Sequence, residues 1–318
     1  MVTRRAHVGM CFDRTFPASL VNEFAHRLDG RADQLWVIED CFYTAGISLA
    51  ASAAAVTDRL TVGIGILPAV ARQAAVAAME IATLCALAPG RILPGIGHGV
   101  QSWMEQMGAR PASPLAALDE VMVAVRRLLH GERVTSAGRY VTLDDVQLYH
   151  PPDDVPPLLA GVRGAKSMEL AGRVADGVVL AEPAAPSYVR WAYENAGQPV
   201  PFHLAVFSVL CVERDRRTAY QTMAPWLASL LDQPTPGITT LPFASEMLEH
   251  YREHGVDGLV TMPPEWWREL APIGTMDDAM AHVRALEEAG VDSIGLWPAR
   301  DVETARGQVD DVLQLAER

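Results

Sequence analysis

Lysine is almost absent from this chain of 318 residues. Lys166 is the only one, and acidic residues outnumber basic ones to give a net charge of −13. Such an acidic chain is poorly suited to binding nucleic acid or an anionic membrane surface. No apolar run approaches the roughly 20 residues that a membrane-spanning helix needs, and the opening residues MVTRRAHVGM lack the apolar segment of a signal peptide. We therefore expect a soluble protein with neither a nucleic-acid nor a membrane partner.

Cysteines and paired histidines are scarce as well. The four cysteines lie far apart, without the close pairs of a zinc site or the density of a secreted disulfide scaffold. This usage predicts a reducing, cytoplasmic location. The histidines include no His-x-His pair, so we expect no metal site. A Gly-x-Ser-x-Gly motif is also missing, which argues against a serine hydrolase.

What the chain does contain is a repeating alternation of strand-like and helix-like segments. The strand-like apolar runs cover residues 7–12, 34–39, 60–67, 91–97, 157–162, 176–182, 203–212 and 292–297. Helical patterns lie between and after them, at 18–28, 47–56, 73–87, 115–129, 166–174, 186–195, 217–231, 276–289 and 302–316. Alternation of this kind predicts βαβ units around a parallel sheet. Eight units in a chain of this length favour a TIM (β/α)8 barrel, with a doubly wound sheet as the alternative.

Two stretches interrupt the alternation, one after the fourth strand and one after the seventh. Residues 132–156 alternate like a short hairpin with a turn at Ala137 and Gly138. Residues 233–274 contain a helix around Phe243 to His254, and we interpret them as a lid over the barrel mouth. No linker divides the chain, so we expect a single domain spanning residues 1–318.

The residues at the ends of the strands are mostly glycines. In a TIM barrel the site lies where the strands end. Here those ends carry Glu39 and Asp40, Gly65, the run Gly97-His98-Gly99, Gly161 to Gly164, and Glu182. Glycine-rich strand ends favour a flat ligand lying against the backbone over a metal held by side chains.

One of these ends also has the pattern of an anion site. The segment AGVRGAKSMELAG, residues 160–172, reads as a strand, a Gly-x-x-Gly turn and a helix. Free amides at the helix start, with Arg163 and Lys166 beside them, would suit a phosphate. An ordinary βα turn with solvated basic side chains fits the local sequence equally well.

The order of six segments resembles the luciferase-like monooxygenase superfamily, and within it the oxidoreductases that use the deazaflavin coenzyme F420. The segments are LWVIEDCF, LTVGIGILPAVAR, LAPGRILPGIGHG, DEVMVAVRRLLHGERVTSAGRYVTLDDVQLYHPP, PPLLAGVRGAKSMELAGRVADGVVLAEP and IGTMDDAMAHVRALEEAGVDSIGLWP. The likeness covers nearly the whole chain apart from roughly 195–270. It implies a TIM barrel, a homodimer, and a planar coenzyme ring seated at the carboxyl ends of the strands.

The resemblance also implies where the coenzyme lies. A bulge with a non-prolyl cis peptide at the end of the third strand supports the ring in this group, and Gly65-Ile66 falls there. Gly97 and Gly99 would give the ring clearance, and the loop after the fifth strand would hold the phosphate. The coenzyme-binding residues implied are Gly65, Ile66, Gly97, His98, Gly99, Gly161, Val162, Arg163, Gly164, Ala165, Lys166 and Glu182.

Departures from the family pattern affect the proton-transfer residues. Several F420 enzymes have a histidine directly after the acidic residue at the end of the second strand, where this chain has Glu39-Asp40. Val100 replaces an acidic residue that often follows the glycines of the fourth strand. The catalytic candidates are therefore Glu39, Asp40 and His98, with Asp40 acting as an acid or base if burial raises its pKa.

Three functions remain open. The first is hydride transfer between F420 and a small organic substrate, in a mostly apolar pocket lined by Trp297, Trp103 and one of Trp266 and Trp267. The second is an FMN-dependent luciferase-like monooxygenase. The third is a barrel that binds a flavin or deazaflavin without turnover, which the departures at the second and fourth strands suggest.

Overall fold

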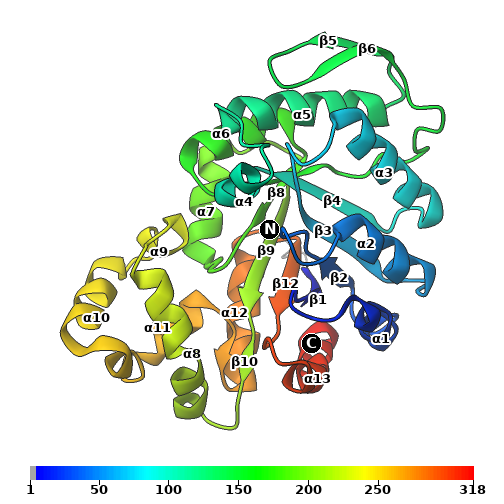
Figure 1. The fold of residues 1–318 in the computed structure, drawn as a ribbon. Coiled ribbons are helices and arrows are strands. Elements are labelled where there is room, and N and C mark those ends of the chain that lie inside the picture. The colour runs from blue at the N-terminus through cyan, green and yellow to red at the C-terminus, as the bar shows by residue number, and fades with distance from the viewer. Residues whose placement is uncertain (1–4) are drawn as a thin grey trace.

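The computed structural model describes residues 5–318 and has eight parallel strands that close into a barrel (Figure 1). Residues 1–4, part of the segment on which the signal-peptide expectation rests, lie outside the described residues. The barrel strands, in chain order, are β1 (His7–Phe12), β2 (Gln34–Val37), β3 (Thr61–Pro68), β4 (Ile92–Gly97), β7 (Leu159–Gly161), β8 (Gly177–Leu180), β9 (His203–Val209) and β12 (Ser293–Trp297). Each pairs with the next, and β1 pairs with β12 to close the ring. The predicted TIM barrel is confirmed.

Helices surround the barrel as the alternation predicts. They are the short 3-10 helix η1 (Ala18–Leu20), α1 (Val21–Leu28), α2 (Gly46–Ala55), α3 (Ala74–Leu87), α4 (Gln101–Gln106), α5 (Pro114–Leu129), α6 (Ala165–Val174), α7 (Pro186–Asn195), α12 (Met276–Glu288) and α13 (Val302–Glu317). Several starts follow from local chemistry. Ser113 accepts a hydrogen bond from Ala116 N at the start of α5, and Thr275 with Asp278 forms a capping box on α12.

The barrel interior is filled by large side chains and closed by polar ones at its amino-terminal end. Trp36 and Phe207 pack edge to face with ring centroids 5.2 Å apart. Gln34 Nε2 donates to Ser293 Oγ (2.8 Å), and His203 Nε2 lies 2.9 Å from the same oxygen. This end of the barrel is a packed floor, and the open mouth lies at the carboxyl ends of the strands.

The first interruption is the predicted hairpin. Strands β5 (Val134–Ala137) and β6 (Thr142–Val146) pair antiparallel, and they lie at the edge of the molecule away from the barrel (Figure 1). The hairpin follows α5, within the connection between the fourth and fifth barrel strands.

The second interruption is larger than predicted. It contains β10 (Cys211–Val212), α8 (Arg216–Leu231), α9 (Pro236–Thr239), α10 (Ala244–Leu259), α11 (Pro264–Leu270) and β11 (Ile273–Gly274), and α8 to α11 lie together beside the barrel (Figure 1). Its side chains form an apolar cluster of their own, in which the Tyr220 and Trp267 rings stack 4.9 Å apart. The helix expected at 217–231 as a barrel helix is therefore wrong in its placement. It is part of this insertion, and α12 is the helix that leads from it into the last strand.

Candidate functional site

A cavity of about 700 Å³ opens at the carboxyl ends of the barrel strands. Most of the residues expected from the sequence line it, namely Glu39, Asp40, Gly65, Ile66, His98, Gly99, Gly161, Val162, Arg163, Gly164 and Glu182. Gly97, Ala165 and Lys166 do not. Ala165 and Lys166 are exposed on the first turn of α6, and Gly97 is buried. Among residues 5–318, no cluster of histidine, cysteine, aspartate or glutamate could hold a metal ion.

Strand β3 is distorted where it reaches the cavity. The Gly65-Ile66 peptide is cis, and the pairing of β3 with β4 shifts register between Ile64 and Leu67. A Cβ on Gly65 would lie 2.3 Å from Phe207 Cζ, so only glycine fits there. The bulge and cis peptide expected at this position are present in the structure.

The glycines of β4 and β7 make room for other atoms of the protein, whereas Gly97 was expected to give clearance to a ligand ring. A Cβ on Gly97 would lie 2.5 Å from the backbone oxygen of Gly161, and one on Gly161 would lie 2.6 Å from Ile66 Cγ2. Both positions thus leave room for the neighbouring strand and for Ile66. Only Gly99, with φ +66°, both lines the cavity and has a backbone conformation that favours glycine.

Glu39 has its carboxylate fully engaged. Its Oε2 accepts a hydrogen bond from Gly46 N (3.0 Å) at the start of α2, and its Oε1 lies 2.7 Å from Arg72 Nη2. Arg72 also pairs with Glu80. Glu39 therefore fixes the loop after β2 against α2 and α3. These contacts indicate a structural role, whereas the sequence suggested Glu39 as a catalytic candidate.

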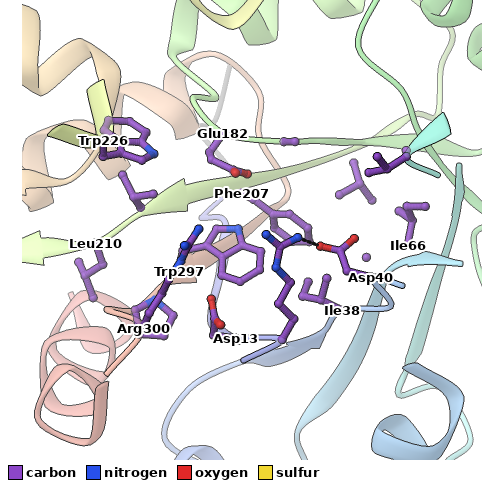
Figure 2. Close-up of a pocket in the computed structure, with 18 of the residues that line it drawn as sticks. Asp13, Ile38, Asp40, Ile66, Glu182, Phe207, Leu210, Trp226, Trp297 and Arg300 are labelled. Atoms are coloured by element: carbon purple, nitrogen blue, oxygen red, sulfur yellow. Dashed lines mark hydrogen bonds and ion pairs between the residues drawn. The ribbon is translucent and has the colours of Figure 1, made fainter. Parts of the chain in front are cut away.

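Asp40 is paired with an arginine, Arg14, that was not predicted from the sequence as a site residue. Arg14, in the loop after β1, donates to Asp40 Oδ2 (Figure 2). The Arg14 guanidinium also lies over the rings of Tyr43 and Trp103, 4.9 Å and 5.7 Å from their centroids. The pair stands inside the cavity, so a positive and a negative charge face the ligand together.

His98 has both ring nitrogens bonded. Nδ1 lies 3.2 Å from the carbonyl oxygen of Pro114, which only accepts, and Nε2 lies 3.1 Å from Ser167 Oγ. Burial lowers the pKa of His98, so the ring is neutral near pH 7. The neutral tautomer that fits donates from Nδ1 and accepts the Ser167 hydroxyl proton at Nε2. His98 thereby ties the end of β4 to the first turn of α6.

Glu182 is the acidic residue of the cavity that differs from the rest. It follows β8, precedes a cis proline, and its carboxyl points into the cavity (Figure 2). Burial raises the pKa of Glu182, an effect that the positive charge of Arg163 opposes. Arg163 itself is exposed at the cavity rim, and its carbonyl accepts the Tyr188 hydroxyl proton.

The aromatic wall agrees only partly with expectation. Trp297 and Trp103 line the cavity, whereas Trp266 and Trp267 are absent from its lining and stack on Phe243 and Tyr220 within the insertion. Trp226 of α8 takes their place. The indole nitrogen of Trp297 is buried without a hydrogen-bond partner among the described residues, so it is a donor available to a ligand.

Several residues of the cavity were missed in the sequence. They are Asp13, Arg14, Ser167, Phe207 and Trp226. Ser167 had a signal, because it lies in the first turn of the helix after the Gly-x-x-Gly loop. Arg14 and Asp13 also follow directly on the first strand-like run, at the end of the barrel where the other candidates were sought. Trp226 had none, since its contact depends on how the insertion packs.

Comparison of the sequence with known proteins identifies a family and several relatives. The sequence pattern of the luciferase-like monooxygenase family matches residues 31–293. A 5,10-methylenetetrahydromethanopterin reductase from Methanolobus tindarius is 32% identical over 47% of this chain and 41% of its own length. An F420-dependent glucose-6-phosphate dehydrogenase from Nakamurella multipartita is 31% identical over 55% of this chain and 56% of its own. The chain thus spans about half the length of these curated relatives.

Solved structures share the fold over the whole chain. The coenzyme F420 dependent tetrahydromethanopterin reductase from Methanopyrus kandleri superposes with a TM-score of 0.79 at 17% identity, covering 99% of both chains. The oxygenating constituent of 3,6-diketocamphane monooxygenase from Pseudomonas putida, in complex with FMN, superposes with a TM-score of 0.69 at 16% identity, covering 99% of both chains.

No helix among residues 5–318 is long and apolar enough to cross a membrane. Barrel, bulged third strand and sequence pattern together show that this chain belongs to the luciferase-like monooxygenase family.

Proposed function

We propose that the protein is an oxidoreductase that transfers a hydride between coenzyme F420 and a small organic substrate. One observation carries the proposal: a single cavity extends from the strand bulge at Gly65-Ile66 to Arg163 and the start of α6. The bulge would support the coenzyme ring. A coenzyme with a flat ring and a phosphate needs both ends. Similar proteins named for F420 support this choice of coenzyme.

The residues present suit F420. The Gly65-Ile66 backbone would support the ring face, and His98 and Gly99 would lie at its edge. The loop from Gly161 to Gly164 would hold the phosphate through amides and Arg163. The unpartnered Trp297 N–H offers a further hydrogen bond to ligand. When bound, F420 supplies the hydride donor and acceptor carbon. The apolar side chains of the cavity keep water from that carbon.

Titration of the purified protein with F420 and, separately, with FMN tests the proposal. We expect ring fluorescence to change on F420 binding, and the affinity to fall at least tenfold in Arg163→Ala because a phosphate contact is lost. Tight FMN binding with no affinity for F420 would overturn the proposal and leave an FMN-dependent monooxygenase, the function of an FMN-bound structural neighbour.

A binding-only barrel is the second alternative, and specific contacts favour it. Asp40 is paired with Arg14, Glu39 with Arg72, and both nitrogens of His98 are bonded. Each of these three groups thus already has partners within the chain. Turnover of F420 with a carbonyl or imine panel, abolished in Asp40→Ala or His98→Ala, would exclude that alternative.

We also propose that the chain is a cytoplasmic, single-domain protein and forms a homodimer. Helix α3 supports the dimer, since its sequence AAVAAMEIATLCAL has a single charged residue, Glu80, although it lies on the outside of the barrel (Figure 1). Val76, Met79 and Leu87 on this helix are 40%, 53% and 60% exposed. An outer helix of this composition is expected to be covered, and a second copy of the chain is the partner we propose.

A further inference from the structure

Three acidic side chains of the cavity have partners in the chain, whereas Glu182 does not; Glu213, which also lines the cavity, is exposed. Glu39 is held by Arg72 and the start of α2, and Asp40 is held by Arg14. Asp13 is buried and accepts hydrogen bonds from the backbone and hydroxyl of Thr15 (2.8 and 2.6 Å). Each of these carboxylates already pairs with an arginine or accepts hydrogen bonds from other residues of the chain.

Glu182 has no such partner. Among residues 5–318, no other residue donates a hydrogen bond to its carboxyl. The side chain leaves the end of β8 and enters the cavity in the part where the rings of Phe207 and Trp297 lie (Figure 2). This carboxyl is therefore open to a ligand.

On the basis of the proposed function, we propose that Glu182 gives the proton to the substrate heteroatom when hydride is transferred to the adjacent carbon, and takes it back in the reverse direction. This assigns to β8 the acid–base role for which the ends of β2 and β4 supply no free group. The substrate class that follows is one with a polar double bond, a carbonyl or an imine, small enough to bring its heteroatom to the carboxyl.

The charges that face Glu182 come from four other segments. Arg163 in the loop before α6 and Arg14 after β1 favour the carboxylate, whereas Asp40 after β2 disfavours it. The buried thiol of Cys11 on β1 also lies within its electrostatic reach. Burial is the largest effect, and it raises the pKa of the Glu182 carboxyl. The protonated form is thus populated at higher pH than in an ordinary glutamate.

The step balances in atoms and electrons. The substrate carbon receives one hydrogen with two electrons from the reduced deazaflavin, and the π bond to the heteroatom breaks. The heteroatom takes a proton from Glu182, so the substrate gains two hydrogens and is reduced by two electrons. The Glu182 carboxylate is then reprotonated through solvent by the proton that the coenzyme releases on oxidation.

The first test needs neither coenzyme nor substrate. Protein labelled with ¹³C at the glutamate δ carbons is titrated by NMR, and the Glu182 resonance is assigned by its loss in Glu182→Gln. We expect this resonance to titrate above the ordinary glutamate value of about 4.3. A Glu182 carboxyl that titrates with the ordinary glutamates overturns the assignment, whatever the coenzyme.

The second test follows hydride transfer from reduced F420 to acetone, cyclohexanone or 2-cyclohexen-1-one by stopped-flow absorbance. Glu182→Gln should slow the step about 100-fold or more and remove the fall in rate at high pH, because the amide cannot supply the proton. F420 affinity is measured in parallel, so that a loss of coenzyme binding is distinguished from a loss of proton transfer. The matched control is Glu169→Gln, an exposed position on α6 outside the cavity.

The outcomes separate this proposal from the proposed function. If wild-type protein does not bind F420, the proposed function fails, while the titration of Glu182 still decides whether the carboxyl can act as an acid. If F420 binds and Glu182→Gln transfers hydride at the wild-type rate with an unchanged pH profile, the proposed function stands and the role of Glu182 is wrong.

Discussion

Ile66 of β3 occupies the space that missing side chains leave at three glycines of two other strands, β4 and β7. Cβ atoms on Gly95, Gly97 and Gly161 would all lie within 3.1 Å of its side chain. From the sequence, Gly97 was expected to give clearance to a ligand ring and Gly161 to lie in the phosphate-binding loop. The sequence could not show that the Ile66 side chain of β3 fills this space, because that contact depends on barrel register.

Gly97→Ala should therefore destabilise the protein. The added methyl would meet the Gly161 backbone oxygen at 2.5 Å, and overpacking of this kind costs about 1–3 kcal/mol. Urea unfolding measures the change in free energy. Gly164→Ala is the control, since its Cβ meets nothing within 4 Å and its φ of −93° suits alanine. Equal stability of the two variants would contradict this packing.

Arg163→Ala should raise the pKa of Glu182, because the positive charge of Arg163 is the largest effect that opposes burial at that carboxyl. The ¹³C titration described above measures the change directly. A phosphate that pairs with Arg163 should move the same pKa in the same direction, so binding of the coenzyme would favour the protonated acid. A resonance that does not move in the variant would show that Arg163 is too solvated to act on Glu182.

At the scale of elements, the insertion between β9 and β12 completes the cavity wall. Thr222, Met223 and Trp226 of α8 face the cavity, although α8 is not one of the helices that surround the barrel. Its amphipathic pattern in the sequence is that of any outer helix. Periodicity predicts that a face is buried and gives no information on what buries it, which is why the barrel assignment of this helix was wrong.

Trp226→Ala should weaken substrate binding without weakening coenzyme binding. The indole lies at the α8 side of the cavity, away from Ile66 (Figure 2). Loss of this surface should raise KM about tenfold, the effect of roughly 1.4 kcal/mol of contact, with the F420 dissociation constant unchanged. A weaker F420 complex in this variant would place the coenzyme against α8 and contradict the proposed orientation.

Acid should weaken the contact between the insertion and α12. His282 on α12 is buried, donates from Nδ1 to the Arg268 carbonyl of α11 (2.7 Å), and burial lowers its pKa to about 4. The unfolded chain binds the proton near pH 6.5. Stability is therefore full above that pH and falls as the pH drops toward 4, by on the order of 3 kcal/mol. Urea unfolding from pH 7 to pH 4 should show this slope, and His282→Gln should flatten it.

For the whole molecule, the order of strands and helices was predictable because each βα unit carries its own pattern of apolar residues and turn signals. Eight such units leave few topologies other than a barrel. The cavity was predictable as a location, the strand ends, and the bulge at Gly65-Ile66 was predictable from the family resemblance. The pairing of Asp40 with Arg14 and of His98 with Ser167 was not, since both join loops far apart in the chain.

The proposed dimer gives a prediction at the same scale. Met79→Glu and Leu87→Glu place charges on the exposed apolar side of α3 and should convert the dimer to a monomer, as measured by size-exclusion chromatography with light scattering. Val256→Glu, an exposed apolar position on α10, is the matched control. A wild-type monomer, or a dimer that survives both α3 variants, would contradict an interface on this helix.

The packing of Ile66 against these glycines limits which substitutions can occur during evolution. A change from glycine at position 161 clashes with Ile66 unless position 66 becomes smaller, and a smaller residue at 66 leaves a void beside the proposed coenzyme site. Single steps away from the present combination are therefore each harmful, while paired steps are tolerated. Among related sequences positions 66 and 161 should therefore vary together, so a change at one of them would mark a lineage in which the packing between β3 and β7 has been rebuilt.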